Sequence, residues 1–190
     1  MIWTKDWAFM HNARCGGHNF KHRVSDQIEV SHPVYTKQSK YTRDQWIHQT
    51  IDYWKKEHHI SDSITWITMV RNPYSRLVSW YYRRWKKILT FDQYIQLVTS
   101  QKTDNIMWMH ITDKIGAHEC RVFYFEDMPE LEEYVGVSFS DTIMNSTSHG
   151  KNIEEFYNED TKNAVKNAYA EEFRRFGYST EPQDFNQKGT

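Results

Sequence analysis

Apolar positions along the chain predict strands that alternate with helices. The stretch 7–13 is mostly apolar and runs into Gly16 and Gly17, after which apolar residues recur at helical spacing from 20 to 28. This order predicts a strand, a glycine turn and a helix. The segment 28–35 has the pattern of a short second strand, which we expect to end at Pro33.

Two later segments have the composition of buried strands. Residues 63–71 are rich in β-branched side chains and almost all apolar, and residues 120–127 are similar. Such runs are typical of parallel strands covered on both faces. The sequence therefore predicts an α/β fold of three layers with a mostly parallel central sheet.

Capping signals predict where the helices begin and end. Thr42 with Gln45 forms a capping-box pattern ahead of a helix that reaches the high 50s. Asn72 suits an N-cap and Pro73 the first turn of a helix to about residue 87. Further helices are predicted at 90–98 behind Thr90, at 131–134, and from Asp160 to Gly177.

Length, charge and cysteine content limit the class of protein. The 190 residues predict one domain, 1–180, with a polar tail, 181–190. Lys and Arg number 24 and Asp and Glu 25, which argues against a nucleic-acid partner. The two cysteines, Cys15 and Cys120, exclude a disulfide framework and a Cys-rich zinc module. Without a long apolar window, we expect a soluble cytoplasmic protein with no membrane partner.

The glycine turn is the first candidate for chemistry. Glycines between a strand and a helix let several backbone N–H groups point at one anion. The turn at 11–19 lacks the Lys-[Ser/Thr] pair of ATP-binding loops, and two adjacent glycines also occur in ordinary tight turns. A phosphate cradle and a simple turn both fit the pattern.

The helix after residue 71 is the second candidate. At about 100° per residue, Asn72, Arg76, Ser79 and Arg83 share one stripe, opposite an apolar side that can pack on the sheet. Arg71, at the end of the strand, and Ser79 can then converge on an anion. Arg76 and Arg83 either contact that ligand or form a solvated basic face.

These residues resemble sulfotransferases that use 3′-phosphoadenosine 5′-phosphosulfate (PAPS), especially Golgi glycan sulfotransferases and their short microbial and viral relatives. The turn 12–19 corresponds in position and glycine content to their P-loop-type 5′-phosphosulfate loop. Segments 123–131, 144–151 and 156–178 resemble their late strand, nucleotide loop and C-terminal helix. Their 3′-phosphate motif, R-[DN]-P-x-x-R-x-x-S-x-Y, is matched by Arg71, Asn72, Pro73, Arg76, Ser79 and Tyr81.

The resemblance implies in-line transfer of a sulfuryl group from PAPS to an acceptor hydroxyl, with a glycan favoured as acceptor and no metal required. The usual loop lysine is replaced by Arg14, which keeps the charge but cannot deliver a proton. The nucleotide loop contributes Asn145, Ser146 and Lys151. The 5′ end of the donor is assigned to Arg14, Cys15, Gly16, Gly17, His18 and Asn19, and the 3′-phosphate to Arg71 and Ser79.

For the catalytic base, the resemblance favours His32, because the family often places a His or Glu just past the second strand. A histidine pKa of about 6.5 suits this role. Glu29 is the rival, and His32 is otherwise a turn histidine beside Pro33.

Three other functions fit parts of the pattern. They are a P-loop kinase-like enzyme, a nucleic-acid-binding accessory protein that uses the basic aromatic segment 81–87, and a catalytically inactive relative that binds PAPS or its product. The identity of the acceptor and the oligomeric state are not given by the sequence.

Overall fold

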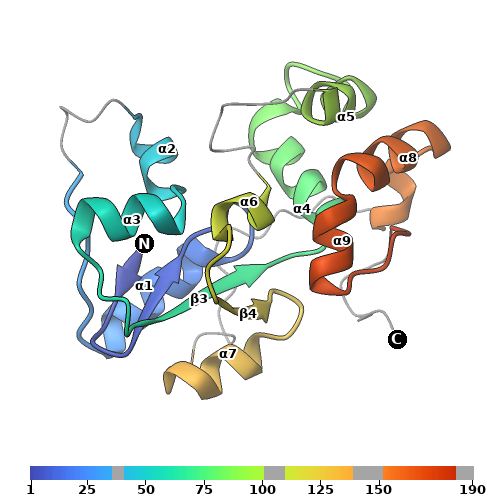
Figure 1. Ribbon diagram of the computed structural model, residues 1–190. Helices are drawn as coiled ribbons and strands as arrows, with labels where there is room; N and C mark the ends of the chain where they lie inside the picture. The colour runs from blue at the N-terminus through green and yellow to red at the C-terminus, as the bar shows by residue number, and fades with distance from the viewer. Residues whose placement is uncertain (36–40, 101–109, 139–151, 183–190) are drawn as a thin grey trace. The chain divides into compact units, whose positions relative to one another are not determined.

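The computed structural model describes residues 1–35, 41–100, 110–138 and 152–182 (Figure 1). The chain divides into two compact units, Met1–Val70 with Asp104–Asn145, and Arg71–Thr103 with Ser146–Thr190. The single domain at 1–180 stays a prediction. Most of the tail at 181–190 lies outside the described residues.

The first unit contains the sheet. Its strands in the described part of the chain are β1 (Ile2–Trp3), β2 (Trp7–Met10), β3 (Thr65–Val70) and β4 (Arg121–Tyr124). They lie side by side in that order, with β1 antiparallel to β2 and the other two pairings parallel. The predicted α/β class, with a mostly parallel sheet, is confirmed.

The helices of the first unit follow the predicted glycine turn and capping signals. Among the described residues they are α1 (Gly17–Gln27), α2 (Arg43–Ile47), α3 (Ile51–His58), α6 (Ile111–Ile115) and α7 (Met128–Val135). The capping box of Thr42 and Gln45 is confirmed. The single helix expected behind it is wrong, because Thr50 accepts a hydrogen bond from the Tyr53 N–H and starts a second helix, α3.

Helices lie on both sides of the sheet. On one face, Phe9 of β2 stacks on Phe20 of α1 with ring centroids 4.3 Å apart. The register places Phe123 of β4 on the same face, where it packs against Tyr134 of α7 at 5.2 Å. Figure 1 shows α3 and α6 on the side of the sheet opposite α7. The apolar runs of β2 and β3 are therefore buried from both sides, as their composition predicts.

The strand expected at 28–35 is not formed. Only Ser31 pairs, through one isolated bridge in which it exchanges two backbone hydrogen bonds with Trp3 of β1. The edge of β2 that a further strand would occupy is taken by β1, which is only two residues long. Because Pro33 has no backbone N–H to donate, the pairing cannot extend along the segment.

The second unit is helical in its described residues. It contains α4 (Pro73–Trp80), the π-helical η1 (Tyr81–Trp85), α5 (Phe91–Ser100), the 3₁₀ turn η2 (Ile153–Phe156), α8 (Glu159–Ala168) and α9 (Ala170–Phe176). The helix predicted to reach residue 87 thus changes to π geometry after Trp80. The last predicted helix breaks at Tyr169, and Asn158 caps it in place of Asp160. The stop at Gly177 is confirmed.

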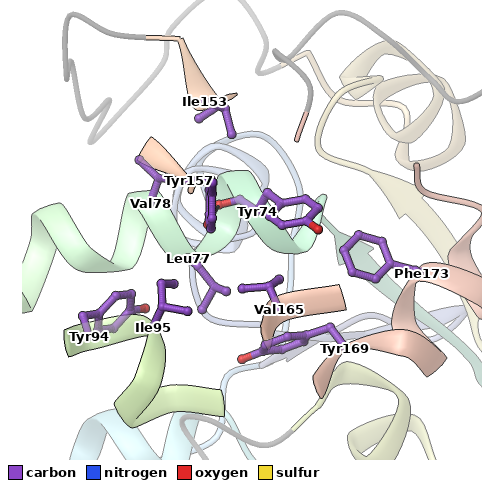
Figure 2. Close-up of a cluster of buried hydrophobic side chains, with 10 residues drawn as sticks. All are labelled: Tyr74, Leu77, Val78, Tyr94, Ile95, Ile153, Tyr157, Val165, Tyr169 and Phe173. Atoms are coloured by element: carbon purple, nitrogen blue, oxygen red, sulfur yellow. Dashed lines mark hydrogen bonds between the residues drawn. The ribbon is translucent and has the colours of Figure 1, made fainter. Parts of the chain in front are cut away.

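A cluster of buried aromatic and aliphatic side chains forms the core of the second unit (Figure 2). Tyr74, Leu77 and Val78 of α4 enter it beside side chains of α5, η2, α8 and α9. The apolar side of α4 that the sequence predicts is thus buried in the helical core of its own unit. The periodicity of these residues was sufficient to show that the side is buried but not what covers it.

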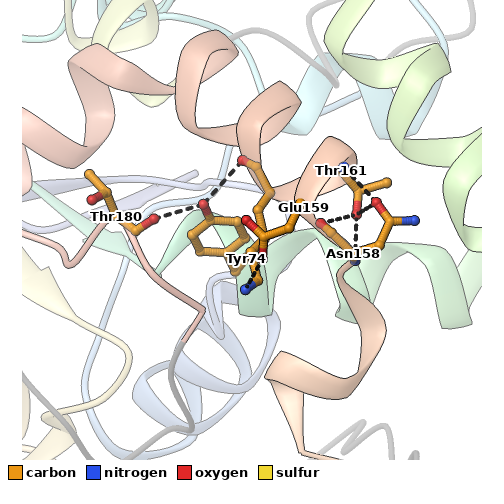
Figure 3. A network of polar contacts seen from close by, with 6 residues as sticks. Tyr74, Asn158, Glu159, Thr161 and Thr180 are labelled. Atoms are coloured by element: carbon orange, nitrogen blue, oxygen red, sulfur yellow. Dashed lines mark hydrogen bonds and ion pairs between the residues drawn. The ribbon is translucent and has the colours of Figure 1, made fainter.

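Hydrogen bonds at Tyr74 hold the end of the described chain against α4 (Figure 3). The Tyr74 hydroxyl lies 2.9 Å from the Thr180 carbonyl oxygen and 3.3 Å from that of Lys162. The Tyr157 hydroxyl donates to the Tyr74 carbonyl at 2.9 Å. These contacts hold α4, η2 and α8 together within their unit.

Candidate active site

The loop between β2 and α1 is anchored to β3 at its start. The Asn12 side-chain amide donates to Thr68 Oγ1 at 2.8 Å and to the Met69 carbonyl at 3.0 Å. Thr68 Oγ1 in turn donates to the Met10 carbonyl at 2.9 Å. Since Asn12 and Thr68 are buried, this network fixes the point at which the chain leaves the sheet.

The two glycines of the loop are required by close packing. A Cβ on Gly16, which has φ of 78°, would lie 2.9 Å from Phe125 Cδ2. A Cβ on Gly17 would overlap His11 Cδ2 and lie 2.6 Å from His11 Nε2. Arg14 also has a left-handed backbone, with φ of 64°, which costs a residue with a side chain about 1 to 2 kcal/mol. Such strain is concentrated at functional sites.

The N-terminus of α1 opens directly out of this loop. Its N-cap is Gly16, which has no side chain to accept a hydrogen bond from the first helical amides. The Phe20 N–H is bonded to the Gly16 carbonyl at 3.2 Å, so the regular helical bonds begin there. The start of α1 therefore carries the partial positive charge and the amide donors that suit an anion.

The side chains of this loop differ in exposure. His18 is exposed and Asn19 half-buried. Cys15 is fully buried, with its thiol 3.6 Å from the Ala13 carbonyl oxygen, so it is not an accessible reactive thiol.

Two buried histidines lie against the loop, and the sequence analysis missed both. His48 donates its Nδ1 proton to the His11 carbonyl at 3.0 Å, and the two rings are 4.6 Å apart. Burial, with Lys114 as the next cause, holds the pKa of His48 at about 3. Burial, followed by His48, lowers the pKa of His11 well below its usual value. Both rings are therefore neutral at neutral pH.

The start of α4 holds the second group of predicted residues. Asn72 Oδ1 accepts a hydrogen bond from the Tyr74 N–H at 2.9 Å, and Pro73 begins the helix, which confirms the predicted cap. Arg71 Nε donates to Ser75 Oγ at 3.0 Å, and Ser75 Oγ donates to the Asn72 carbonyl at 3.2 Å. Ser75 thus positions the Arg71 guanidinium, a role that the motif alone did not indicate.

Ser79 and Arg71 are both buried, with 2% and 7% of their surfaces exposed. Arg83 is exposed on η1, in agreement with a solvated basic face.

Arg76 does not lie on a solvated basic face, which was one of its two expected roles. One of its guanidinium nitrogens lies 3.1 Å and 3.0 Å from the two carboxylate oxygens of Glu172 in α9, and the Arg76 guanidinium also lies over the ring of Tyr169. Glu172 is completely buried and Arg76 is 6% exposed. Arg76 is therefore part of a buried ion pair that joins α4 to α9, and not part of a solvated face.

Comparison with protein families gives one result. The model described as "Sulfotransferase family" matches residues 7–130, which is well over half of the chain. The chain belongs to the sulfotransferase family. Searches of curated proteins and of solved structures found no significant match.

The matched part of this sulfotransferase includes both groups of residues described above, the loop Arg14–Asn19 and the motif from Arg71 to Ser79. The loop lies in the first unit and the motif in the second. Asn145, Ser146 and Lys151 lie beyond the match and outside the described residues.

The two candidates for the base of the sulfotransferase are both exposed and both follow α1. His32 Nε2 lies 3.4 Å from Ser25 Oγ, and burial, then Lys21, lowers the pKa of His32. Its ring is therefore neutral near pH 7, as a base must be. Glu29 is an exposed carboxylate three residues earlier.

Two further features concern ligands and membranes. In residues 1–35, 41–100, 110–138 and 152–182, no group of three or more His, Cys, Asp or Glu side chains is placed to hold a metal ion. None of the helices in these ranges combines the length and the apolar character that a membrane crossing requires.

Proposed function

We propose that this sulfotransferase moves the sulfuryl group of PAPS to an acceptor hydroxyl, with a carbohydrate as the acceptor. The single observation that carries the proposal is the start of α1, where a glycine N-cap follows a loop fixed to the sheet in a member of the sulfotransferase family. The carbohydrate acceptor rests on the resemblance to glycan sulfotransferases.

In this proposal the 5′-phosphosulfate lies at the N-terminus of α1. The backbone of Gly16, Gly17, His18 and Asn19 donates to it, and Arg14 supplies the cation near the oxygen that leaves with the nucleotide. Fixed donors of this kind stabilise charge as it develops, because they need not reorganise during the reaction. The burial of Cys15 limits its part to the shape and backbone of the loop.

The 3′-phosphate is assigned to Arg71 and Ser79. An arginine whose Nε is already bound to Ser75 is held in one orientation, so less side-chain freedom is lost when it binds an anion. Asn145, Ser146 and Lys151 are the proposed contacts from the nucleotide loop.

For the acceptor, we propose His32 as the base that removes the hydroxyl proton, with Glu29 as the alternative. The acceptor oxygen attacks sulfur, the bond from sulfur to the bridging oxygen breaks, and the hydroxyl proton passes to the base. Charge builds on the leaving phosphate oxygen near Arg14. The reaction as proposed uses no metal.

Nucleotide selection tests the donor. Adenosine 3′,5′-bisphosphate, without magnesium, should raise the melting temperature more than ADP or ATP at equal concentration, because only it carries the 3′-phosphate assigned to Arg71. Equal shifts from all three nucleotides would contradict the proposal and favour the kinase-like alternative. A larger shift with adenosine 3′,5′-bisphosphate but no sulfuryl transfer would indicate the inactive relative.

Substitution of the two candidate bases tests the acceptor side. His32→Ala should lower turnover by roughly 10² to 10⁴, the usual contribution of a general base, and leave binding of adenosine 3′,5′-bisphosphate nearly unchanged. Glu29→Gln, made as the matched control, should have a much smaller effect on turnover. Full activity in His32→Ala together with loss of activity in Glu29→Gln would assign the base to the carboxylate instead.

A further inference from the structure

His11 is a buried histidine at the site with no role in the proposed reaction. It follows the last residue of β2 and has 8% of its surface exposed. Its ring presents the Cδ2–Nε2 edge to Gly17, the first residue of α1. No hydrogen bond joins the ring nitrogens of His11 to any other residue in the described part of the chain. A buried polar ring therefore faces the helix N-terminus, and its nitrogens have no hydrogen-bond partner among the described residues.

Two other aromatic rings lie beside the ring of His11. The His48 Nδ1 proton is donated to the backbone carbonyl of His11, and the His48 ring lies beside the His11 ring. The adjacent Phe9 ring adds a further contact at 6.2 Å. A side chain so enclosed cannot turn away from Gly17 without disturbing the loop.

We propose that His11 is a further donor-binding residue, which takes up a proton from solvent when the anionic 5′ end of the nucleotide binds at the start of α1. This inference rests on the proposed function. The protonated ring would donate from Nε2 to a phosphate oxygen, and in the free protein the ring is neutral. The structure thus supplies a cation at this end of the site beside Arg14, which has replaced the usual lysine of the loop.

The charged groups around His11 explain why the proton is absent before binding. Burial is the main cause of its low pKa, followed by His48, the amino group of Met1, Lys114 and His18. Each of these groups carries positive charge or can gain it, so each disfavours a further proton on His11. A bound phosphate brings the opposite charge, and an opposite charge within about 4 to 6 Å favours the protonated ring and so raises the pKa of a histidine. Binding and protonation are therefore coupled.

Calorimetry of the full chain with adenosine 3′,5′-bisphosphate tests this coupling. The binding enthalpy is measured in several buffers that differ in ionisation enthalpy, and the slope gives the protons taken up. The measurement is made at about pH 7.5, where the phosphate groups of the nucleotide, whose second pKa is about 6, are already ionised. Wild type should take up a measurable fraction of a proton per bound nucleotide. Binding should also become tighter as the pH falls, because uptake of a proton accompanies it.

Three variants assign the proton. His11→Asn should reduce the uptake to near zero and weaken binding severalfold, whereas a proton should still be taken up by His18→Asn. His59→Asn is the matched control, because His59 is exposed and has a left-handed backbone that asparagine tolerates. It should change neither quantity.

The failures of the two proposals are distinguishable. If wild type does not bind adenosine 3′,5′-bisphosphate, the proposed function fails and this inference fails with it. If the nucleotide binds with a slope near zero in wild type, only the inference is overturned, even if His11→Asn does not fold. Loss of the proton uptake in His18→Asn, or its persistence in His11→Asn, would also overturn it.

Discussion

The buried ion pair between Arg76 and Glu172 offers the sharpest test of the second unit. Replacing Arg76 by Met leaves the Glu172 carboxylate, which has no exposed surface, without its cation. Replacing Glu172 by Met leaves the guanidinium buried in the same way. Removing one partner of a buried pair typically costs about 3 to 5 kcal/mol, because the remaining charge keeps its desolvation penalty.

The double variant separates this penalty from the packing of the side chains. With both charges gone, two Met side chains fill the space between α4 and α9, and no charge is left buried. The double variant should therefore lose less stability than either single variant, whereas independent effects would add to about 6 to 10 kcal/mol. Tyr169, whose ring lies 5.4 Å from the Arg76 guanidinium carbon, is unchanged in all three proteins.

Urea unfolding followed by circular dichroism measures the four free energies of the cycle. Arg174→Met is the control, because Arg174 forms an exposed pair with Glu171 on the same helix, at 2.6 and 2.8 Å, and should cost less than about 1 kcal/mol. Additive losses in the double variant, or single losses no larger than that of Arg174→Met, would refute the assignment of Arg76 as a buried structural residue.

Two further predictions concern the loop and the phosphate motif. Arg71→Ala should weaken binding of adenosine 3′,5′-bisphosphate by about 1.5 to 3 kcal/mol, the value of a charge-assisted hydrogen bond, with the fold intact; unchanged affinity by calorimetry would make Arg71 structural. Gly17→Ala should cost about 2 to 3 kcal/mol in urea unfolding, in the upper part of the usual range for overpacking, because its Cβ would overlap the His11 ring. Gly136→Ala, where the backbone is left-handed but the space is open, should cost only about 1 kcal/mol, and an equal loss in the two variants would exclude overlap as the cause.

Local signals were sufficient to predict most of the elements. The buried strand ending at Val70, the cap at Asn72 and the glycine stop at Gly177 each depend on a few adjacent residues, and all three are present. The segment 28–35 has the alternation of a strand, yet whether it pairs is decided by which strand occupies the edge of β2. That competitor, β1, is too short to leave a pattern in the sequence.

In the candidate site, too, local features were predictable and long-range contacts were not. The residues of the loop and of the motif each lie close together in the sequence, so they could be recognised from the sequence alone. Arg76 is buried because it pairs with Glu172, which lies 96 positions further along the chain. Helical periodicity cannot show which acidic side chain will pair with a residue on the polar side of a helix. His11 gave only one signal, its position just before the glycine turn, and His48 gave none, because its contact with the His11 carbonyl forms only in the fold.

Transfer of labelled sulfate tests the central claim most directly. The full chain, given PAPS labelled in its sulfuryl group and no added metal, is assayed against panels of carbohydrate, peptide and lipid acceptors. The proposal predicts label on a carbohydrate hydroxyl, with formation of adenosine 3′,5′-bisphosphate in equal amount and loss of transfer in His32→Ala. Label on a peptide or lipid alone would contradict the proposed acceptor, and no transfer to any acceptor by protein that binds the nucleotide would contradict the proposed reaction.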